Sequence, residues 1–289
     1  MFAIIGATGK VGRTTAEILR KAGKPVRAIV RDPSKADGLA ALGCETAVAE
    51  AHDVEALARA FAGAAAVQVI CPVAPQADDA GGEMRGMIEA IGEALEIARP
   101  ARVLAISDYG AELSAPTGIT SLFHHLERRL GRLSQPTLFL RSAEHMQNWS
   151  RVLGVAARTG KLPSLHHPLA KLFPMVSAFD VGAVAAELLL APSEASPRVV
   201  HVEGPRRYTA MDVAAAVAAL DGREVQAFEL PRSEWMATLT KGGVSESYAR
   251  LVVELYDVHN AGRIDAEAGG GPIRRGRTEF IDALREARA

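Results

Sequence analysis

The sequence of 289 residues has few cysteines, few aromatic side chains and no long apolar run. Only two cysteines, Cys44 and Cys71, are present, which excludes a disulfide framework and fits a reducing cytoplasm. Both lie in strand-like runs, so we interpret them as small buried side chains. No apolar stretch reaches the roughly 18 residues that a membrane span needs, and no basic segment with a cleavage signal opens the chain. We therefore expect a cytoplasmic protein without a membrane partner.

The sequence also lacks an excess of charge of either sign. Lysine plus arginine number 33 and aspartate plus glutamate number 34, which gives a net charge of −1. A protein that binds nucleic acid directly needs a basic surface that attracts phosphates, so we expect no nucleic-acid partner. The remaining composition, 48% hydrophobic and 23% charged, is typical of an α/β protein with a substantial core.

Three glycines, Gly6, Gly9 and Gly12, directly follow a short apolar run and directly precede a helical pattern. A strand that turns into a helix leaves backbone N–H groups unpaired at the helix start, where the positive end of the helix dipole also lies. We assign Gly6 to the tight turn, Gly9 to the close approach of a diphosphate and Gly12 to close packing of helix on strand. The predicted cofactor-binding residues of this turn are Gly6, Thr8, Gly9, Lys10, Val11 and Gly12.

Strand-like and helix-like patterns alternate through residues 1–148. Strands are expected at 2–6, 26–31, 45–49, 66–71, 102–107 and 137–141. Helices are expected between the first two strands and at 53–62, 80–99 and 119–133. Continuous apolar runs are typical of parallel strands covered on both faces, and the alternation predicts right-handed βαβ crossovers. The fold class is therefore α/β, a Rossmann-type doubly wound parallel sheet with a smaller, mainly helical C-terminal domain.

The pattern changes after Arg141. Residues 149–176 contain several prolines and histidines and are expected to be loop-rich. A helix over 181–191, capped by Asp180, and a strand over 198–202 come next. Helices then dominate, at 210–220, 232–241, 245–259 and 277–287. We assign residues 1–148 to an NAD(P)-binding Rossmann domain to which 178–203 return, and residues 149–177 and 204–289 to a smaller substrate or partner domain.

The residues after the second strand bear on the choice between NAD and NADP. An acidic residue there binds the ribose hydroxyls of NAD and repels the 2′-phosphate of NADP, whereas a guanidinium pairs with that phosphate. This chain has Arg31 at that place and Lys35 shortly after it, so we predict NADP(H) in preference to NAD(H). Asp32 leaves NAD open, since its carboxylate suits the ribose hydroxyls. Further predicted cofactor contacts are Asp53, whose alternative role is a helix N-cap, and Cys71, Pro72 and Ser107.

Five stretches of the chain resemble the NmrA-like family, atypical members of the short-chain dehydrogenase/reductase superfamily. They are Gly6–Gly12, Val30–Pro33, Leu140–Arg141 with Asn148–Trp149, Asp180–Gly182 and Val202–Pro205, and they occur in the family's order. The resemblance implies a Rossmann domain plus a smaller C-terminal domain, with NAD(P) in the cleft between them. The family includes NADPH-dependent quinone and phenylpropanoid reductases, and also catalytically silent proteins thought to sense the NADP(H) ratio.

The proton-donating pair of most short-chain reductases, Tyr-x-x-x-Lys, is missing. No tyrosine is followed four residues later by lysine, and no lysine occurs between Lys35 and Lys161. Hydride transfer survives this loss if the acceptor is electrophilic enough, as a quinone is. The candidate proton donors are Tyr109 and His124. Each has an alternative structural role, a hydrogen bond for Tyr109 and helix packing for His124.

The expected substrate pocket follows the fifth and sixth strands and contains Asp108, Tyr109, His145 and Asn148. No carboxylate or cysteine lies at ligand spacing from His166 and His167, so we expect no metal. The leading hypothesis is an NADPH-dependent oxidoreductase that acts on a small apolar electrophile such as a quinone. The alternative is a catalytically silent redox sensor that binds NADP(H) and a regulatory protein partner. The sequence leaves the oligomeric state open.

Overall fold

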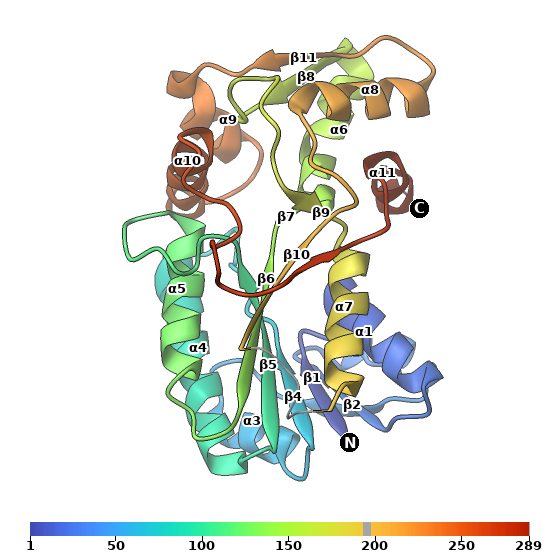
Figure 1. Cartoon of the computed structure of the whole chain (residues 1–289), viewed down its shortest axis with the longest axis vertical. Coiled ribbons are helices and arrows are strands. Elements are labelled where there is room, and N and C mark those ends of the chain that lie inside the picture. Colours follow the sequence, from blue (N-terminus) through green and yellow to red (C-terminus); the bar gives the residue numbers. More distant parts are fainter. Residues whose placement is uncertain (193–197, 289) are drawn as a thin grey trace.

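A parallel sheet of eight strands forms the base of the molecule in Figure 1, a computed structural model that describes residues 1–192 and 198–288. The strand order is β12-β10-β6-β5-β4-β1-β2-β3. The strands are β1 (Phe2–Ile5), β2 (Val26–Val30), β3 (Glu45–Val48), β4 (Ala66–Val69), β5 (Arg102–Asp108), β6 (Thr137–Ser142), β10 (Val199–Glu203) and β12 (Ile273–Arg275). The α/β fold that the alternating apolar runs predict is confirmed.

The order of the strands reverses between β1 and β4. From β1 the chain runs outward through β2 and β3, then returns to the other side of β1 and runs outward through β4, β5 and β6. Phe2 accordingly pairs with Val26 on one side and with Ala66 on the other. Ligands of such sheets bind beyond the carboxyl ends of the strands at the reversal. The turns after β1 and β4 therefore mark the expected ligand site.

Helices cover both faces of the sheet (Figure 1). On one face α1 (Lys10–Lys21) packs against α7 (Ala178–Leu190). The other face carries α3 (Val54–Phe61), α4 (Ala80–Ala98) and α5 (Ile119–Leu130). Each side has its own buried cluster, with Ile4, Leu19 and Val181 in one and Val67 and Ile88 in the other. Short side chains that accept backbone N–H groups begin several of these helices, as Asp53 does for α3.

A second layer, formed largely by the chain after β6, lies above the carboxyl ends of the strands (Figure 1). Its elements are β7 (Glu144–His145), η2 (Met146–Trp149), α6 (Ser150–Thr159), β8 (Lys161–Ser164), β9 (Met175–Val176), α8 (Ala210–Asp221), β11 (Gln226–Glu229), η4 (Arg232–Glu234), α9 (Trp235–Lys241), α10 (Glu246–Asn260) and α11 (Phe280–Arg288). Between β2 and β3 lie η1 (Pro33–Lys35) and α2 (Asp37–Ala40). Trp149 packs in the second layer against the rings of His166 and Phe280.

The loop-rich prediction for residues 149–176 is wrong in part, because α6, β8 and β9 lie there. Helix α6 buries only Leu153 and Ala156, so its apolar periodicity is weak. Strand β8 contains Pro163, a residue that argues against a strand in the middle of a sheet. It is accommodated because β8 pairs only with β11 in a sheet of two strands.

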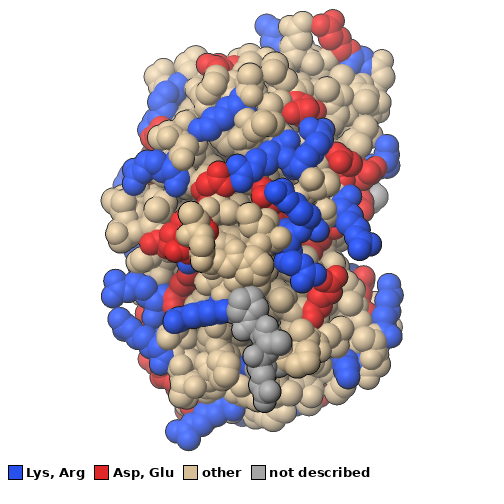
Figure 2. All heavy atoms as spheres, in the orientation of Figure 1, with Lys and Arg blue, Asp and Glu red and all other residues tan. Residues whose placement is uncertain are grey.

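Charges of both signs are intermixed on the face of the molecule that Figure 2 shows. Several arginines in the second half of the chain are paired with carboxylates, including Arg207 with Asp265 and Arg206 with Glu279. Such exposed pairs contribute little to stability, but they leave charge balanced locally. Within residues 1–192 and 198–288, the helices are too short or too polar to cross a membrane.

Candidate functional site

The turn after β1 requires glycine at two positions for reasons internal to the protein. Gly6 has a φ of +82°, and a Cβ there would lie 2.8 Å from the Cβ of Ile70 after β4. A Cβ on Gly12 would lie 2.4 Å from the carbonyl oxygen of Gly6. Both distances are shorter than van der Waals contact. Gly6 therefore permits the turn, and Gly12 permits α1 to pack closely on it, as the sequence predicts.

Gly9 differs from the other two glycines, because the protein itself leaves space beside it. A Cβ on Gly9 would have the carbonyl oxygen of Gly6 as its nearest neighbour, at an ordinary 3.5 Å. Gly9 precedes α1 without a side-chain cap, and the first turn of α1 holds no acidic residue. The first N–H groups of α1 have no partner within the helix and lie at its positive end. This cradle fits a dinucleotide diphosphate.

A cavity of about 370 Å³ lies over this cradle. It is lined by Gly6, Gly9, Lys10, Val11, Gly12, Ile70, His145, Gln147, Asn148, Ser150, Arg151 and Ala178. Five of the six residues predicted from the glycine turn to bind the diphosphate line this cavity, and the sixth, Thr8, is exposed beside it. Gln147 is fixed there, because its side-chain amide accepts from the N–H of Ala178 and donates to Ser177. The second layer thus supplies the wall opposite the glycines.

The basic residues predicted to select the cofactor follow β2. Arg31 and Lys35 are exposed, and neither side chain makes a hydrogen bond or an ion pair with another described residue. Asp32 uses one carboxylate oxygen to accept the N–H of Ser34 at 2.9 Å, and hydrogen bonding with the side chain and then the backbone of Ser34 lowers the pKa of Asp32. Asp53 accepts the N–H of Ala56, which is the N-cap role weighed for it. A contact between Asp53 and a cofactor stays a prediction.

A second, more apolar cavity of about 420 Å³ adjoins the first. Both are lined by Val11, Ile70, His145, Asn148 and Arg151. Its apolar wall comes from the sheet, from α5 and from the second layer, and includes Val73, Ile106, Ile119, Phe123, Leu165, Leu239, Val252 and Leu255. Cys71 and Pro72 line it after β4. Burial raises the pKa of the Cys71 thiol to about 12, so this side chain stays a neutral thiol.

Ser107 and Asp108 end β5 at the floor of this apolar cavity. The Ser107 hydroxyl donates to Glu127 Oε1 at 2.6 Å. Thr120 of α5 donates its hydroxyl to Asp108 Oδ2 at 2.6 Å. Burial, together with the nearby carboxylate of Glu144, raises the pKa of Asp108 to about 7. Asp108 therefore carries a proton in part of the molecules at neutral pH.

Beneath the floor, Arg141 of β6 holds three carboxylates. Its side chain is 5% exposed and binds Glu127 through two nitrogens, both at 2.8 Å. It also pairs with Glu112 at 3.0 Å and with Glu267 of the C-terminal segment at 2.5 Å. Because Glu127 also accepts from Ser107, the arginine indirectly fixes the Ser107 hydroxyl near the end of β5. A bidentate arginine of this kind positions its partners firmly.

Neither of the two proposed proton donors lines the apolar cavity. Tyr109 lies in the turn after β5, where its N–H donates to the carbonyl oxygen of Ser142. It is 1% exposed, packs edge-on against His201, and is absent from the cavity wall. His124 Nδ1 donates to the carbonyl oxygen of Ala111 at 2.8 Å, and this residue does not line the cavity either. Both side chains make packing contacts within the protein, and a role in proton transfer stays a prediction.

Sequence reasoning missed a polar network on the far wall of the apolar cavity. Glu144 accepts from His166 Nε2 at 2.7 Å and from the Tyr256 hydroxyl at 2.9 Å. Burial acts to raise the pKa of Glu144, but His166 outweighs it, helped by His259 and Tyr256, so this pKa lies below its ordinary value. The position of Glu144, just after β6 at the carboxyl edge of the sheet, is the signal that could have identified it.

Two further histidines of this wall are neutral at physiological pH. Burial lowers the pKa of His145 to about 4 and that of His259 to about 4. His145 contacts the Ser142 hydroxyl at 3.1 Å. Although Glu144 lies against His166, no group of three or more histidine, cysteine, aspartate or glutamate side chains among the described residues is placed to hold a metal.

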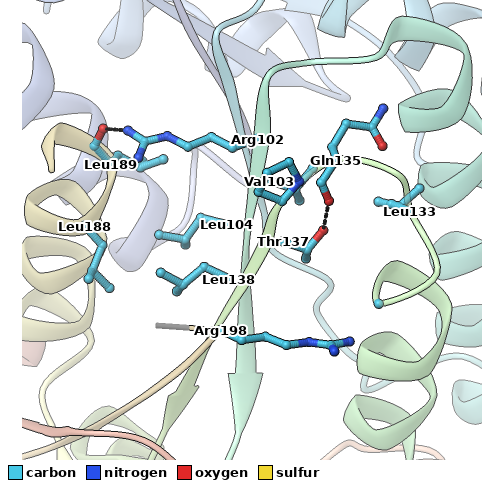
Figure 3. A pocket seen from close by; sticks show the side chains of 12 residues that line it. Arg102, Val103, Leu104, Leu133, Gln135, Thr137, Leu138, Leu188, Leu189 and Arg198 are labelled. Carbon is cyan, nitrogen blue, oxygen red and sulfur yellow. Dashed lines mark hydrogen bonds between the residues drawn. The ribbon is translucent and has the colours of Figure 1, made fainter. Parts of the chain in front are cut away.

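A separate cavity of about 360 Å³ lies at the opposite end of the sheet (Figure 3). Its residues come from the starts of β5 and β6 and from the end of α7. Arg102 donates to the carbonyl oxygens of Leu189 and Ala191, so it closes the end of α7. Because ligands of parallel sheets bind at the carboxyl edge, this cavity at the amino edge is not the candidate site.

Comparisons with known proteins agree with this fold. The model of the NmrA-like family matches residues 1–270. An NAD(P)H azoreductase from Xenophilus azovorans is 26% identical over 257 residues, which cover 89% of this chain and 86% of that protein. The NADPH-dependent quinone oxidoreductase of Escherichia coli, solved with NADPH, has a TM-score of 0.81 and 22% identity, with 100% of both chains covered. Triphenylmethane reductase from Citrobacter sp., solved with NADP(H), has a TM-score of 0.81 and 20% identity, with 99% of this chain and 100% of that chain covered.

Proposed function

The chain belongs to the NmrA-like family, and we propose that it is an NADPH-dependent oxidoreductase that transfers hydride to a small apolar electrophile such as a quinone. The observation that carries this proposal is the junction of two cavities. One lies over the glycine cradle and the other is apolar, and they share Val11, Ile70, His145, Asn148 and Arg151. A dinucleotide held in the first has an apolar pocket beside it for an acceptor.

Different residues of the chain bind different parts of the cofactor and of the acceptor. The first-turn N–H groups of α1 bind the diphosphate. Arg31 and Lys35 carry unpaired charges suited to a 2′-phosphate, and this is the basis for proposing NADP(H) in preference to NAD(H). When bound, NADPH supplies a hydride, which carries two electrons. The apolar wall excludes water and orients the acceptor, which is where most of the rate enhancement for a reactive electrophile arises.

The acceptor class follows from the walls of the apolar cavity. Aliphatic and aromatic side chains such as Phe123, Leu165 and Leu239 make up most of it. Flat, conjugated and weakly polar electrophiles suit such a lining. Quinones meet this description, and the azo compounds and triphenylmethane dyes named for the relatives are two further classes worth including in a substrate panel.

A steady-state assay tests the proposed function. Purified protein with NADPH and a panel of quinones, an azo dye and a triarylmethane dye should oxidise NADPH faster than the protein-free mixture. Leu239→Trp, which fills the apolar cavity from α9, should raise the KM for the acceptor at least tenfold while NADPH binding stays within about twofold. No acceleration with any acceptor would contradict the proposal.

One observation favours a second function. Tyr109 and His124 both pack within the protein. A redox sensor without turnover needs no proton donor, so this arrangement is compatible with one. A sensor would bind NADP(H) tightly, consume none with any acceptor, and capture a regulatory protein in only one redox state of the cofactor. That combination of results would replace the oxidoreductase by the sensor.

A further inference from the structure

Asp108 is the acidic side chain at the floor of the apolar cavity. It is the last residue of β5, at the carboxyl edge of the sheet, and its side chain lines the cavity. Thr120 Oγ1 holds one of its carboxylate oxygens, Oδ2, at 2.6 Å. No other side chain among the described residues hydrogen-bonds this carboxyl. One oxygen is thus fixed while the other is free of side-chain partners.

The surroundings of Asp108 favour its protonated form. Burial has the largest effect, and Glu144 of β7 and Glu112, after β5, repel its negative charge. The hydrogen bond from Thr120 of α5 acts in the opposite direction, and the resulting pKa is about 7. A group that acts as a general acid works best when its pKa lies near the working pH.

The other titratable groups of the cavity are less suited to give up a proton. His145 and His259 have pKa values of about 4 and are neutral at pH 7. Tyr256 donates its hydroxyl to Glu144, and burial together with that carboxylate raises its pKa well above the ordinary value. The pKa of Glu144 is lowered, so Glu144 is ionised.

We propose that Asp108 donates the proton that completes reduction of the acceptor, a role that rests on the proposed function. A quinone that has gained a hydride bears one negative oxygen and needs one proton. The O–H bond of Asp108 breaks, its electron pair stays on the carboxylate, and a new O–H bond forms on the product. Water then returns a proton to Asp108. NADPH, quinone and one solvent proton are consumed, and NADP⁺ and hydroquinone are formed.

A titration that needs no turnover tests whether Asp108 holds this proton. Infrared difference spectra of the folded protein between pH 5 and 9 report the C=O stretch of protonated carboxyl groups. In the wild type one such band should titrate with a midpoint near 7, and Asp108→Asn should lack it. Thr120→Val should move the midpoint upward, because the hydrogen bond that lowers the pKa is gone.

Single-turnover reduction of a quinone gives the second readout. The wild-type rate should fall as the pH rises above the same midpoint. Asp108→Asn should be about 100-fold slower at pH 6 and lose this pH dependence, and Thr120→Val should shift it upward together with the infrared band. Asp282→Asn, an exposed change of equal charge on α11, should behave as the wild type.

The outcomes separate the two proposals. A wild type that binds no NADPH and reduces no quinone refutes the proposed function and the proton-donor role with it. Quinone reduction by Asp108→Asn with the wild-type rate and pH profile overturns the role of Asp108 alone. A wild type without a carboxyl band that titrates near neutrality, or with a band that Asp108→Asn retains, also overturns that role.

Discussion

Glu144 and His166, both in the second layer, are joined by a hydrogen bond of 2.7 Å between Oε2 and Nε2. The Glu144 side chain is 9% exposed and that of His166 is 1% exposed. His166 lies among the rings of Trp149, Phe173 and Tyr256. A carboxylate after β6 is thereby tied to the wall that the second layer adds to the apolar cavity.

Glu144→Gln should destabilise the protein, because it removes the charge that His166 and Tyr256 hydrogen-bond. We expect the free energy of unfolding in urea to fall by about 2 kcal/mol. Tyr256→Phe removes one hydrogen bond and keeps the ring, so it should cost only about 1 kcal/mol. A Glu144→Gln variant as stable as the wild type would show that the network does not stabilise the second layer.

The glycines of the turn after β1 should respond differently to alanine. Gly12→Ala places a Cβ 2.4 Å from the Gly6 carbonyl oxygen, so it should lower the free energy of unfolding by about 2 kcal/mol. Gly9→Ala meets nothing closer than 3.5 Å and should stay within about 1 kcal/mol of the wild type. Its methyl group should nevertheless weaken NADPH binding at least tenfold, as measured by fluorescence titration. Unchanged NADPH affinity in Gly9→Ala would argue that no diphosphate approaches this residue.

Arg31→Ala should weaken NADPH binding about 10- to 100-fold, the loss expected for a charge-assisted hydrogen bond. NADH binding should change by less than about twofold, because NADH carries no 2′-phosphate. The matched control is Arg59→Ala on α3, where a guanidinium with 71% exposure is removed elsewhere on the surface. Equal losses for the two coenzymes would contradict the assignment of Arg31 to the 2′-phosphate.

The free energy of unfolding of Asp108→Asn, minus that of the wild type, should increase as the pH rises from 4 to 8. The raised pKa of Asp108, from 3.8 to about 7, means that the folded protein binds more protons than the unfolded chain in this window. The wild type therefore loses stability as the pH rises through it. A shift of three full pKa units corresponds to a change in stability of about 4 kcal/mol. Because Asp108 faces the cavity, where solvent screens its charge, we expect the stability difference to change by about 2 kcal/mol.

The histidines of the cavity act with the opposite sign, since their folded pKa values of about 4 add stability as the pH rises from 4 to about 6.5. They are present in both the wild type and Asp108→Asn and cancel in the difference. Urea unfolding of the two proteins at several pH values measures the difference in their free energies of unfolding. A difference that does not vary with pH would show that Asp108 titrates normally.

Local patterns in the sequence were sufficient for the sheet and for the glycine turn. The apolar runs identify the strands because both faces of a parallel sheet are covered, and Gly12 is required by the backbone of Gly6 nearby, although the contact that excludes a Cβ on Gly6 comes from Ile70 after β4. Helix α6 was missed because it buries only two side chains. Its structure depends on packing against other parts of the second layer.

The polar network around Glu144 could not be predicted from the sequence for a different reason. Glu144 lies 22 residues from His166 and 112 residues from Tyr256 along the chain, and only the tertiary fold brings them together. Tyr109 and His124 have residue types that suit proton transfer, but neither lines the apolar cavity. Where a side chain points after a strand or on a helix depends on the tertiary fold, which the residue type does not reveal.

Isothermal titration calorimetry of the whole chain with NADPH and NADH tests the central claim most directly, that the turn after β1 and Arg31 together bind NADPH. We predict one site per chain and an affinity for NADPH at least tenfold higher than that for NADH. No heat from either coenzyme, reduced or oxidised, with protein that is folded by circular dichroism would contradict the account.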